Sequence, residues 1–142
     1  MSQAKESSGP VLKFKHIGVA VPRLDEAVCA HRSIFGYEVL SGPFDDPLQR
    51  VSVCFVGTGE AGLTIELIAP LAEDSPIKRT LASGGGAYHL CYEVENIEQT
   101  MTELLAKGCV AWGDLVPAVA FGGRRIGWLF TPWRQLLEIV ER

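Results

Sequence analysis

The sequence predicts an α+β fold in which two copies of a βαβββ unit form one curved mixed sheet, shaped like a cup. Each half begins with an alternating strand, continues with an amphipathic helix followed by glycine, and ends with three further β-like runs. Each half also has a histidine in its first strand and a glutamate in its last. Because a unit of ~60 residues buries too little surface to be stable alone, the two halves should share one core.

The first half should contain one helix packed on its opening strand. That strand is predicted at about 13–21, where apolar residues alternate with polar or small ones. The helix is predicted at about 24–35, because apolar residues recur at helical spacing and Gly36 follows as a C-terminal signal. The stripe expected to face the sheet consists of Leu24, Ala27, Val28, Ile34 and Phe35.

The second half repeats this order after a connector at 70–86 that should hold a short helix. A strand at about 87–94 leads into a helix at about 96–107, with Asn96 as the expected N-cap and Gly108 after its end. The apolar stripe of this helix consists of Ile97, Met101, Leu104 and Leu105. The remaining strands are predicted at about 37–41, 50–57, 62–69, 109–113, 124–131 and 135–140.

These elements predict a single domain at 13–142, with its two modules at about 13–70 and 87–141. Residues 1–12 are expected to form a flexible tail, because they are mainly polar and lack the apolar stretch of a signal peptide. The net charge is −4 and Lys and Arg never cluster, so we expect no nucleic-acid partner. No apolar run approaches the ~20 residues of a membrane span, so we expect no membrane partner.

The four cysteines favour a reducing environment. Cys29, Cys54, Cys91 and Cys109 each lie in an apolar segment, and none belongs to a Cys-x-x-Cys pair. They are therefore expected to be buried free thiols with a structural role. A cytoplasmic location is the default for such a chain.

A histidine and a glutamate occupy matching positions in the two halves. His16 precedes Glu66 by 66 − 16 = 50 residues, and His89 precedes Glu138 by 138 − 89 = 49. The two-residue period of a strand places all four side chains on the side away from the helices, so they should meet inside the cup. A buried carboxylate between apolar neighbours requires a partner. The pattern therefore predicts a site for one divalent metal ion.

Two imidazoles and two carboxylates suit Co²⁺, Zn²⁺, Ni²⁺, Mn²⁺ or Fe²⁺. The absence of thiolate ligands argues against a closed structural zinc site. Four ligands around an octahedral ion leave two positions open, and an ion with open positions acts as a Lewis acid on a carbonyl oxygen. We therefore expect an enzyme that acts on a small carbonyl compound.

Several segments also resemble one known family. They are 15–21 (KHIGVAV), 51–56 (VSVCFV), 65–71 (IELIAPL), 74–77 (DSPI) and 88–97 (YHLCYEVENI). Together they resemble the vicinal oxygen chelate superfamily, and most of all its methylmalonyl-CoA epimerase-like branch. The resemblance covers about 13–141 and implies one divalent ion bound by His16, Glu66, His89 and Glu138. It also implies that Glu138 is the catalytic acid/base of an epimerase or isomerase that removes a proton next to a metal-bound carbonyl.

The sequence departs from that branch around its substrate site. The stretch 130–135 is shorter than the glycine-rich His-Pro-Lys loop usual before the last strand, and the third strand carries no acid. Gln49 and Arg50 replace the residues that usually precede that strand. The resemblance therefore supports the metal site more strongly than it supports an acyl-thioester substrate. Gln49 and Arg125 are the candidate substrate-binding residues, since a guanidinium binds carboxylate or phosphate.

Other functions with the same fold remain open. A glyoxalase-type lyase or another superfamily enzyme would use the same ligands on a different carbonyl compound, although the residues near Glu66 are apolar and show no glutathione-binding pattern. A dioxygenase site would leave Glu66 without a role. A small-molecule-binding resistance protein would not need all four ligands. Unpaired edge strands favour association, and the resemblance implies a homodimer because members of the family commonly pair their sheets across subunits.

Overall fold

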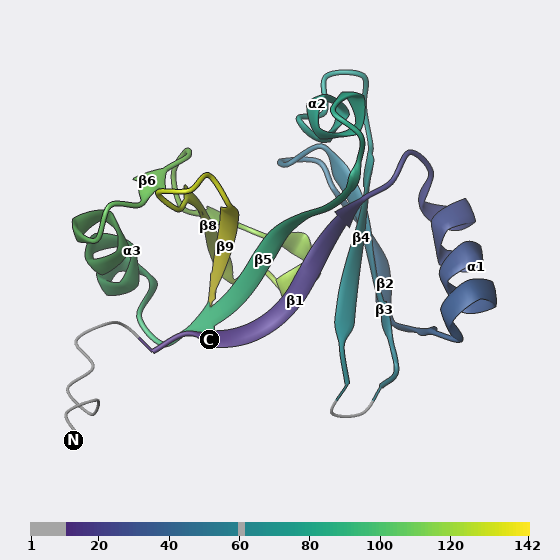
Figure 1. Ribbon diagram of the computed structural model, residues 1–142, viewed down its shortest axis with the longest axis horizontal. Helices are drawn as coiled ribbons and strands as arrows, with labels where there is room; N and C mark the ends of the chain where they lie inside the picture. The colour runs from purple at the N-terminus through teal and green to yellow at the C-terminus, as the bar shows by residue number, and fades with distance from the viewer. Residues whose placement is uncertain (1–10, 60–61) are drawn as a thin grey trace.

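The computed structural model describes residues 11–59 and 62–142, and every strand in these residues belongs to one curved, nine-stranded sheet that does not close (Figure 1). The predicted α+β fold is therefore confirmed. The elements of the first module are β1 (Lys13–Ala20), α1 (Leu24–Phe35), β2 (Glu38–Asp46), β3 (Val51–Gly57) and β4 (Thr64–Pro70). The connecting helix is α2 (Ile77–Ala82). The elements of the second module are β5 (Gly86–Val94), α3 (Ile97–Ala106), β6 (Val110–Ala111), β7 (Val116–Pro117), the 3₁₀ turn η2 (Val119–Phe121), β8 (Arg125–Phe130) and β9 (Leu136–Glu141).

The two modules meet at their opening strands. The strand order is β2-β3-β4-β1-β5-β9-β8-β6, and β7 pairs with β8. Within each module the first and last strands are parallel, β1 with β4 and β5 with β9, whereas β1 and β5 are antiparallel. Figure 1 shows β1 and β5 crossing the centre side by side, with β2–β4 and α1 in one lobe and β6, β8, β9 and α3 in the other. Of the predicted tail at 1–12, only Val11 and Leu12 are among the described residues.

The helices pack on the outer faces of the sheet less completely than the periodicity predicts. Leu24, Ala27 and Val28 of α1 contact the buried cluster formed by β3 and β4. Ile34 and Phe35, which were expected in the same stripe, are 70% and 57% exposed, because α1 ends beyond the sheet surface that its first turns cover.

In the second module, α3 buries Ile97 and Leu104, with Met101 partly buried beside them. Leu105 is 42% exposed, contrary to its predicted place in the stripe, and Thr100 is buried instead. The side chain of Asn96 accepts a hydrogen bond of 3.0 Å from the backbone N–H of Gln99, which confirms the predicted N-cap.

Three local predictions need correction. β2 continues to Asp46 rather than ending near 41, since it pairs with β3 along its length through two irregularities in register. The strand predicted at 109–113 is only two residues long, and β7 and η2 follow it without a periodic signal in the sequence. Cys29 is exposed and Cys109 is partly exposed, so only Cys54 and Cys91 are buried thiols.

No helix in the described residues is both long enough and apolar enough to cross a membrane.

Candidate metal centre

The two halves of the site are built by the same pairing of strands. Gly18 is the register partner of Glu66 in the β1–β4 ladder, and Cys91 is the register partner of Glu138 in the β5–β9 ladder. Each of these partners lies two residues after a histidine, so the histidine points to the same face of the sheet as the glutamate. The spacing from His16 to Glu66 is one residue longer than that from His89 to Glu138. This difference lies outside the paired strands, because the two ladders place the histidine and the glutamate in the same relative register.

The antiparallel β1–β5 pair brings the two halves together. His16 is the register partner of Cys91, and Gly18 is the register partner of His89, so each histidine faces the other module. A Cβ atom at Gly18 would collide with the imidazole ring of His89. Glycine at this position is thus a condition for bringing the second histidine next to the first.

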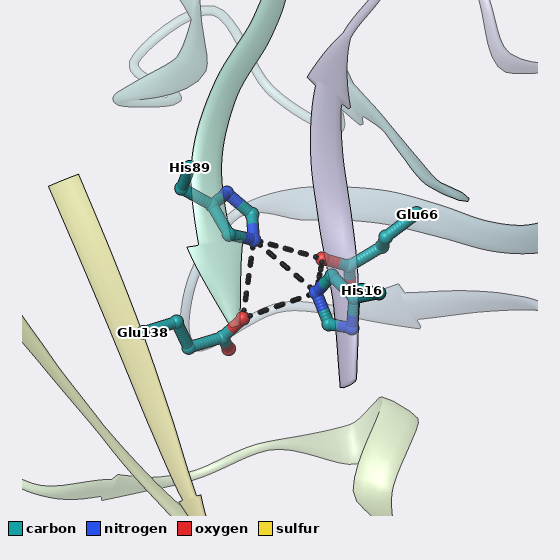
Figure 2. A group of neighbouring side chains, drawn as sticks. All are labelled: His16, Glu66, His89 and Glu138. Carbon is teal, nitrogen blue, oxygen red and sulfur yellow. Dashed lines mark hydrogen bonds and ion pairs between the residues drawn. The ribbon is translucent and has the colours of Figure 1, made fainter. Parts of the chain in front are cut away.

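Four ligand atoms converge at the centre of the cup (Figure 2). Nε2 of His16 lies 3.0 Å from Oε1 of Glu66 and 3.3 Å from Oε1 of Glu138. Nε2 of His89 lies 3.4 Å and 3.2 Å from the same two oxygens, and the two Nε2 atoms are 3.3 Å apart. All four atoms lie within 4.8 Å of one another, and all four residues are buried.

This arrangement fits a divalent ion. Ligands about 2.0–2.2 Å from one ion lie about 2.8–3.1 Å apart as neighbours in octahedral coordination and about 3.3–3.6 Å apart in tetrahedral coordination. The five separations between a histidine nitrogen and a carboxylate oxygen, or between the two histidine nitrogens, are 3.0 to 3.4 Å and lie within the span of these two geometries. Oε1 of Glu138 is buried and lies 3.3 and 3.2 Å from the two imidazole Nε2 atoms, so one ion could contact this oxygen and both nitrogens. The two carboxylates would balance the charge of the ion.

Without a metal, the four residues form a tightly coupled ionic cluster. Burial alone would lower the pKa of His16, but the carboxylates of Glu138 and Glu66 raise it to about 9. The pKa of His89 is raised against the effect of burial by the same two carboxylates. Burial would raise the pKa of Glu138, but hydrogen bonds with His16 and His89 lower it to about 2, and the pKa of Glu66 is lowered in the same way.

The cluster lies at the bottom of a large cavity between the two lobes. The cavity has a volume of about 1230 Å³, and Glu66, His89 and Glu138 are among the residues that line it. Its walls near these ligands are mainly apolar, with Val53 and Ile68 from the first module and Trp128 and Leu136 from the second. Gln49, predicted to contact substrate, also lines this cavity, and its amide donates to Oδ2 of Asp46 at 2.9 Å.

Arg125, the other residue predicted to contact substrate, lies outside the lining of this cavity. Its guanidinium donates to both carboxylate oxygens of Glu141, at 3.1 and 3.0 Å, and lies 2.7 Å from the carboxylate of Glu98. Its donors are therefore committed to ion pairs outside the site.

Two aromatic side chains of the site pack against His89. The ring of Tyr88 packs edge-on against His89 with centroids 4.6 Å apart, and the ring of Trp128 does so at 4.9 Å. Trp128 is the register partner of Glu138 in the β8–β9 ladder, so correct pairing of the last two predicted strands would have placed it beside the ligands. Tyr88 could have been suspected only from its position next to His89 in the sequence.

The chain is similar to proteins of known structure and function. The family model described as Glyoxalase/Bleomycin resistance protein/Dioxygenase superfamily matches residues 15–128. An ethylmalonyl-CoA/methylmalonyl-CoA epimerase of Cereibacter sphaeroides is 34% identical over 116 residues, which are 80% of this chain and 84% of that protein. The mitochondrial methylmalonyl-CoA epimerase of Mus musculus is 40% identical over 126 residues, which are 85% of this chain and 68% of that protein.

Solved structures agree with these relatives. A Streptomyces coelicolor methylmalonyl-CoA epimerase variant in complex with 2-nitronate-propionyl-CoA is 26% identical and superposes with a TM-score of 0.77, covering 92% of this chain and 98% of that one. Sequence match, fold and ligand arrangement therefore lead to the same assignment. The chain belongs to the glyoxalase/bleomycin resistance protein/dioxygenase superfamily.

Proposed function

We propose that the protein is a divalent-metal-dependent epimerase that moves a proton at the carbon next to the carbonyl of an acyl-CoA thioester, with methylmalonyl-CoA as the first substrate to test. The observation that carries this proposal is the convergence of two histidines and two glutamates at the bottom of the 1230 Å³ cavity. Epimerase relatives at 34–40% identity support an epimerase-like function of the isomerase type. The complex of a 26% identical neighbour with 2-nitronate-propionyl-CoA supports a thioester substrate.

His16, Glu66, His89 and Glu138 are the residues that would hold the ion. The chemistry supplied by a divalent ion bound there is Lewis-acid polarisation of a carbonyl oxygen. This is a reason for substrate to bind with its carbonyl at the bottom of the cavity and its acidic C–H bond beside the ligands. The side chains of Val53, Ile68 and Trp128 make the walls of that region apolar.

Glu138 is proposed as the base. In the metal-free protein the neighbouring imidazoles lower the pKa of Glu138, so it is a carboxylate near neutral pH and can accept a proton. As the C–H bond breaks, its electron pair becomes conjugated with the carbonyl and the proton moves to Glu138. Inversion requires a proton to return to the opposite face of the carbon. β3 carries no acid to supply it, so we assign this step to water in the cavity near Gln49.

Hydrogen exchange tests the proposal. Metal-loaded protein incubated with methylmalonyl-CoA in D₂O should incorporate deuterium at the α-carbon and interconvert the two epimers. Absence of both exchange and interconversion with every malonyl-type thioester tried would overturn the assignment. Formation of a product with a broken or new carbon–sulfur bond would instead identify a glyoxalase-type lyase.

We also propose that the protein is a homodimer, on the strength of its edges. β2 is nine residues long and lies at one end of the sheet order, with Val39 and Leu40 about 40% exposed on it. An edge of this length favours pairing with another surface. Light scattering should return about twice the chain mass of 15.4 kDa, and a mass near 15.4 kDa at every working concentration would contradict the proposal.

A further inference from the structure

Two arginines adopt a backbone conformation that normally belongs to glycine. Arg50 has φ = 60° and Arg134 has φ = 71°, and they are the only non-glycine residues with positive φ in the described residues. A side chain at such a position crowds the backbone, so glycine or asparagine is usual there. Both arginines line the cavity above the metal centre. At two separate turns, a long cation thus occupies a position where a smaller residue would fit better.

Backbone hydrogen bonds impose the conformation at both turns. The carbonyl of Arg50 accepts from the N–H of Leu71 at 3.0 Å, which ties the start of β3 to the segment after β4. The N–H of Arg134 donates to the carbonyl of Thr131 at 2.8 Å, and the N–H of Thr131 donates to the carbonyl of Gln135 at 2.9 Å. Both turns are therefore held by backbone hydrogen bonds, which do not depend on the arginine side chains. The presence of arginine rather than glycine at positions 50 and 134 therefore needs an explanation other than the geometry of the turn.

The two turns face each other across the cavity. Arg50 precedes β3, which begins beside the end of β4, whereas Arg134 precedes β9, which begins beside the first half of β5. Both turns are thus at the end of the sheet where α2 leads into β5, one in each lobe (Figure 1). The cavity has cations on opposite walls at this end.

The guanidinium groups at these positions are largely available. Nη1 of Arg50 lies 3.7 Å from Oδ2 of Asp74, and both side chains are well exposed, at 46% and 72%, so this ion pair is weak. Arg134 is exposed and has no ion pair within 4.0 Å among the described residues. Arg125, by contrast, has its donors committed to Glu141 and Glu98.

We propose that Arg50 and Arg134 bind the phosphate groups of the acyl carrier while the acyl group lies at the metal centre. This inference rests on the proposed function and extends it to the carrier end of the substrate. Guanidinium groups suit phosphate because their planar fork donates two parallel hydrogen bonds. The cavity, at about 1230 Å³, is larger than the range of roughly 300–1,000 Å³ typical of sites for small ligands, so it has room for a carrier as well as an acyl group.

Calorimetric binding of free CoA tests the inference without any reaction. Each of the variants Arg50→Gly and Arg134→Gly should bind CoA about tenfold more weakly, the loss expected for one charge-assisted contact. Their melting temperatures should stay equal or rise, because glycine relieves the positive φ. Arg32→Ala on α1, which removes an exposed positive charge far from the cavity, should bind CoA like the wild type. Equal CoA affinity in the wild type and both glycine variants would overturn the inference.

One further ligand and one further variant identify the contact. Pantetheine lacks the phosphates of CoA, so the wild type should bind CoA better than pantetheine, and the two glycine variants should lose this preference. Asp74→Asn, which removes the carboxylate competing for Arg50, should strengthen CoA binding. A wild type that binds CoA and pantetheine equally would also overturn the inference. Loss of CoA affinity in the variants, together with no hydrogen exchange in any malonyl thioester, would support the phosphate site and contradict the proposed epimerase.

Discussion

The two half-sites hold their ligands alike but place them in different surroundings. His16 is fully buried beside Phe55 and Phe121, with ring centroids 5.4 and 6.1 Å away, and it does not line the cavity. His89 lies between Tyr88 and Trp128 and does line it. Duplication of the βαβββ unit thus accounts for the ligand set, whereas the asymmetry of the neighbours decides from which side a substrate can approach.

Loss of either histidine should have the largest effect, and it should be equal in the two halves. His16→Ala and His89→Ala each remove one of four candidate ligands, so metal affinity should fall by more than the ~10–100-fold typical of changing a residue that only orients a ligand. Elemental analysis after anaerobic reconstitution and competition with a chelator measure this. His31→Ala on α1, outside the cluster, is the control. If His16→Ala kept its metal while His89→Ala lost it, the two half-sites would not be equivalent as ligands.

Removing the proposed base should separate catalysis from metal binding. The amide of Glu138→Gln still has an oxygen that can contact the ion, but it is too weak a base to accept the proton. The rate of hydrogen exchange at the α-carbon of the substrate should therefore fall by about 10²–10⁴-fold. The comparison variant is Glu66→Gln, the matching carboxylate of the first half. With metal content measured in both, exchange should suffer more in Glu138→Gln. Unchanged exchange in metal-loaded Glu138→Gln would remove Glu138 as the base.

Gly18 and Cys91 occupy equivalent positions in the two modules. Their alanine variants therefore compare how tightly the side chains are packed around the site in each half. Gly18→Ala places a methyl group against the ring of His89 and should destabilise the fold by roughly 1–3 kcal/mol, as overpacking of a core does. Cys91→Ala removes one buried atom and should cost only about 1 kcal/mol. Chemical denaturation measures both. A Gly18→Ala variant as stable as the wild type would show that the His89 ring can move away at little cost.

The grouping of the four candidate ligands was predictable, because alternate side chains of a strand lie on the same face of the sheet. Alternation in β1 and β5 placed His16 and His89 on the concave face, and the same period placed Glu66 and Glu138 beside them. Features set by tertiary contacts were not accessible in this way. The period of α1 predicted burial of Ile34 and Phe35, but the sheet does not extend beneath them. Positive φ at Arg50 and Arg134 could not be foreseen either, because neither residue type signals such a turn.

Arg125 illustrates the same limit for charged residues. A guanidinium near the last strands was a reasonable candidate for contact with an anion. Glu98 and Glu141 form ion pairs with Arg125, but both are far from it in the sequence, so these pairs could not be predicted. Whether an arginine is available to a ligand in the cavity depends on whether an acidic side chain already forms an ion pair with it. Only the assembled sheet shows that Arg125 is paired and that Arg134 is exposed at the cavity.

The last predicted effect is a difference in pH dependence between the metal-free and metal-bound protein. In the metal-free protein the pKa of His16 rises from 6.5 to about 9 on folding, so its contribution to stability is complete below 6.5 and is lost as pH rises through 9. The pKa of Glu138 falls from 4.5 to about 2, so its contribution is present above 4.5 and is lost as pH falls through 2. The cluster therefore stabilises the metal-free fold most between 4.5 and 6.5.

Metal binding should remove the fall in stability above pH 6.5. Bound imidazoles are unprotonated in the folded state, and free histidine is unprotonated above 6.5 in the unfolded state, so neither state takes up or loses protons there. The melting temperature of the zinc-loaded protein should thus stay level from pH 6.5 to 9, while that of the metal-free protein declines and the gap widens. Metal-free His16→Asn, which lacks the raised imidazole, should decline less than the metal-free wild type. Parallel curves with and without zinc would mean that His16 does not carry the extra proton in the metal-free fold.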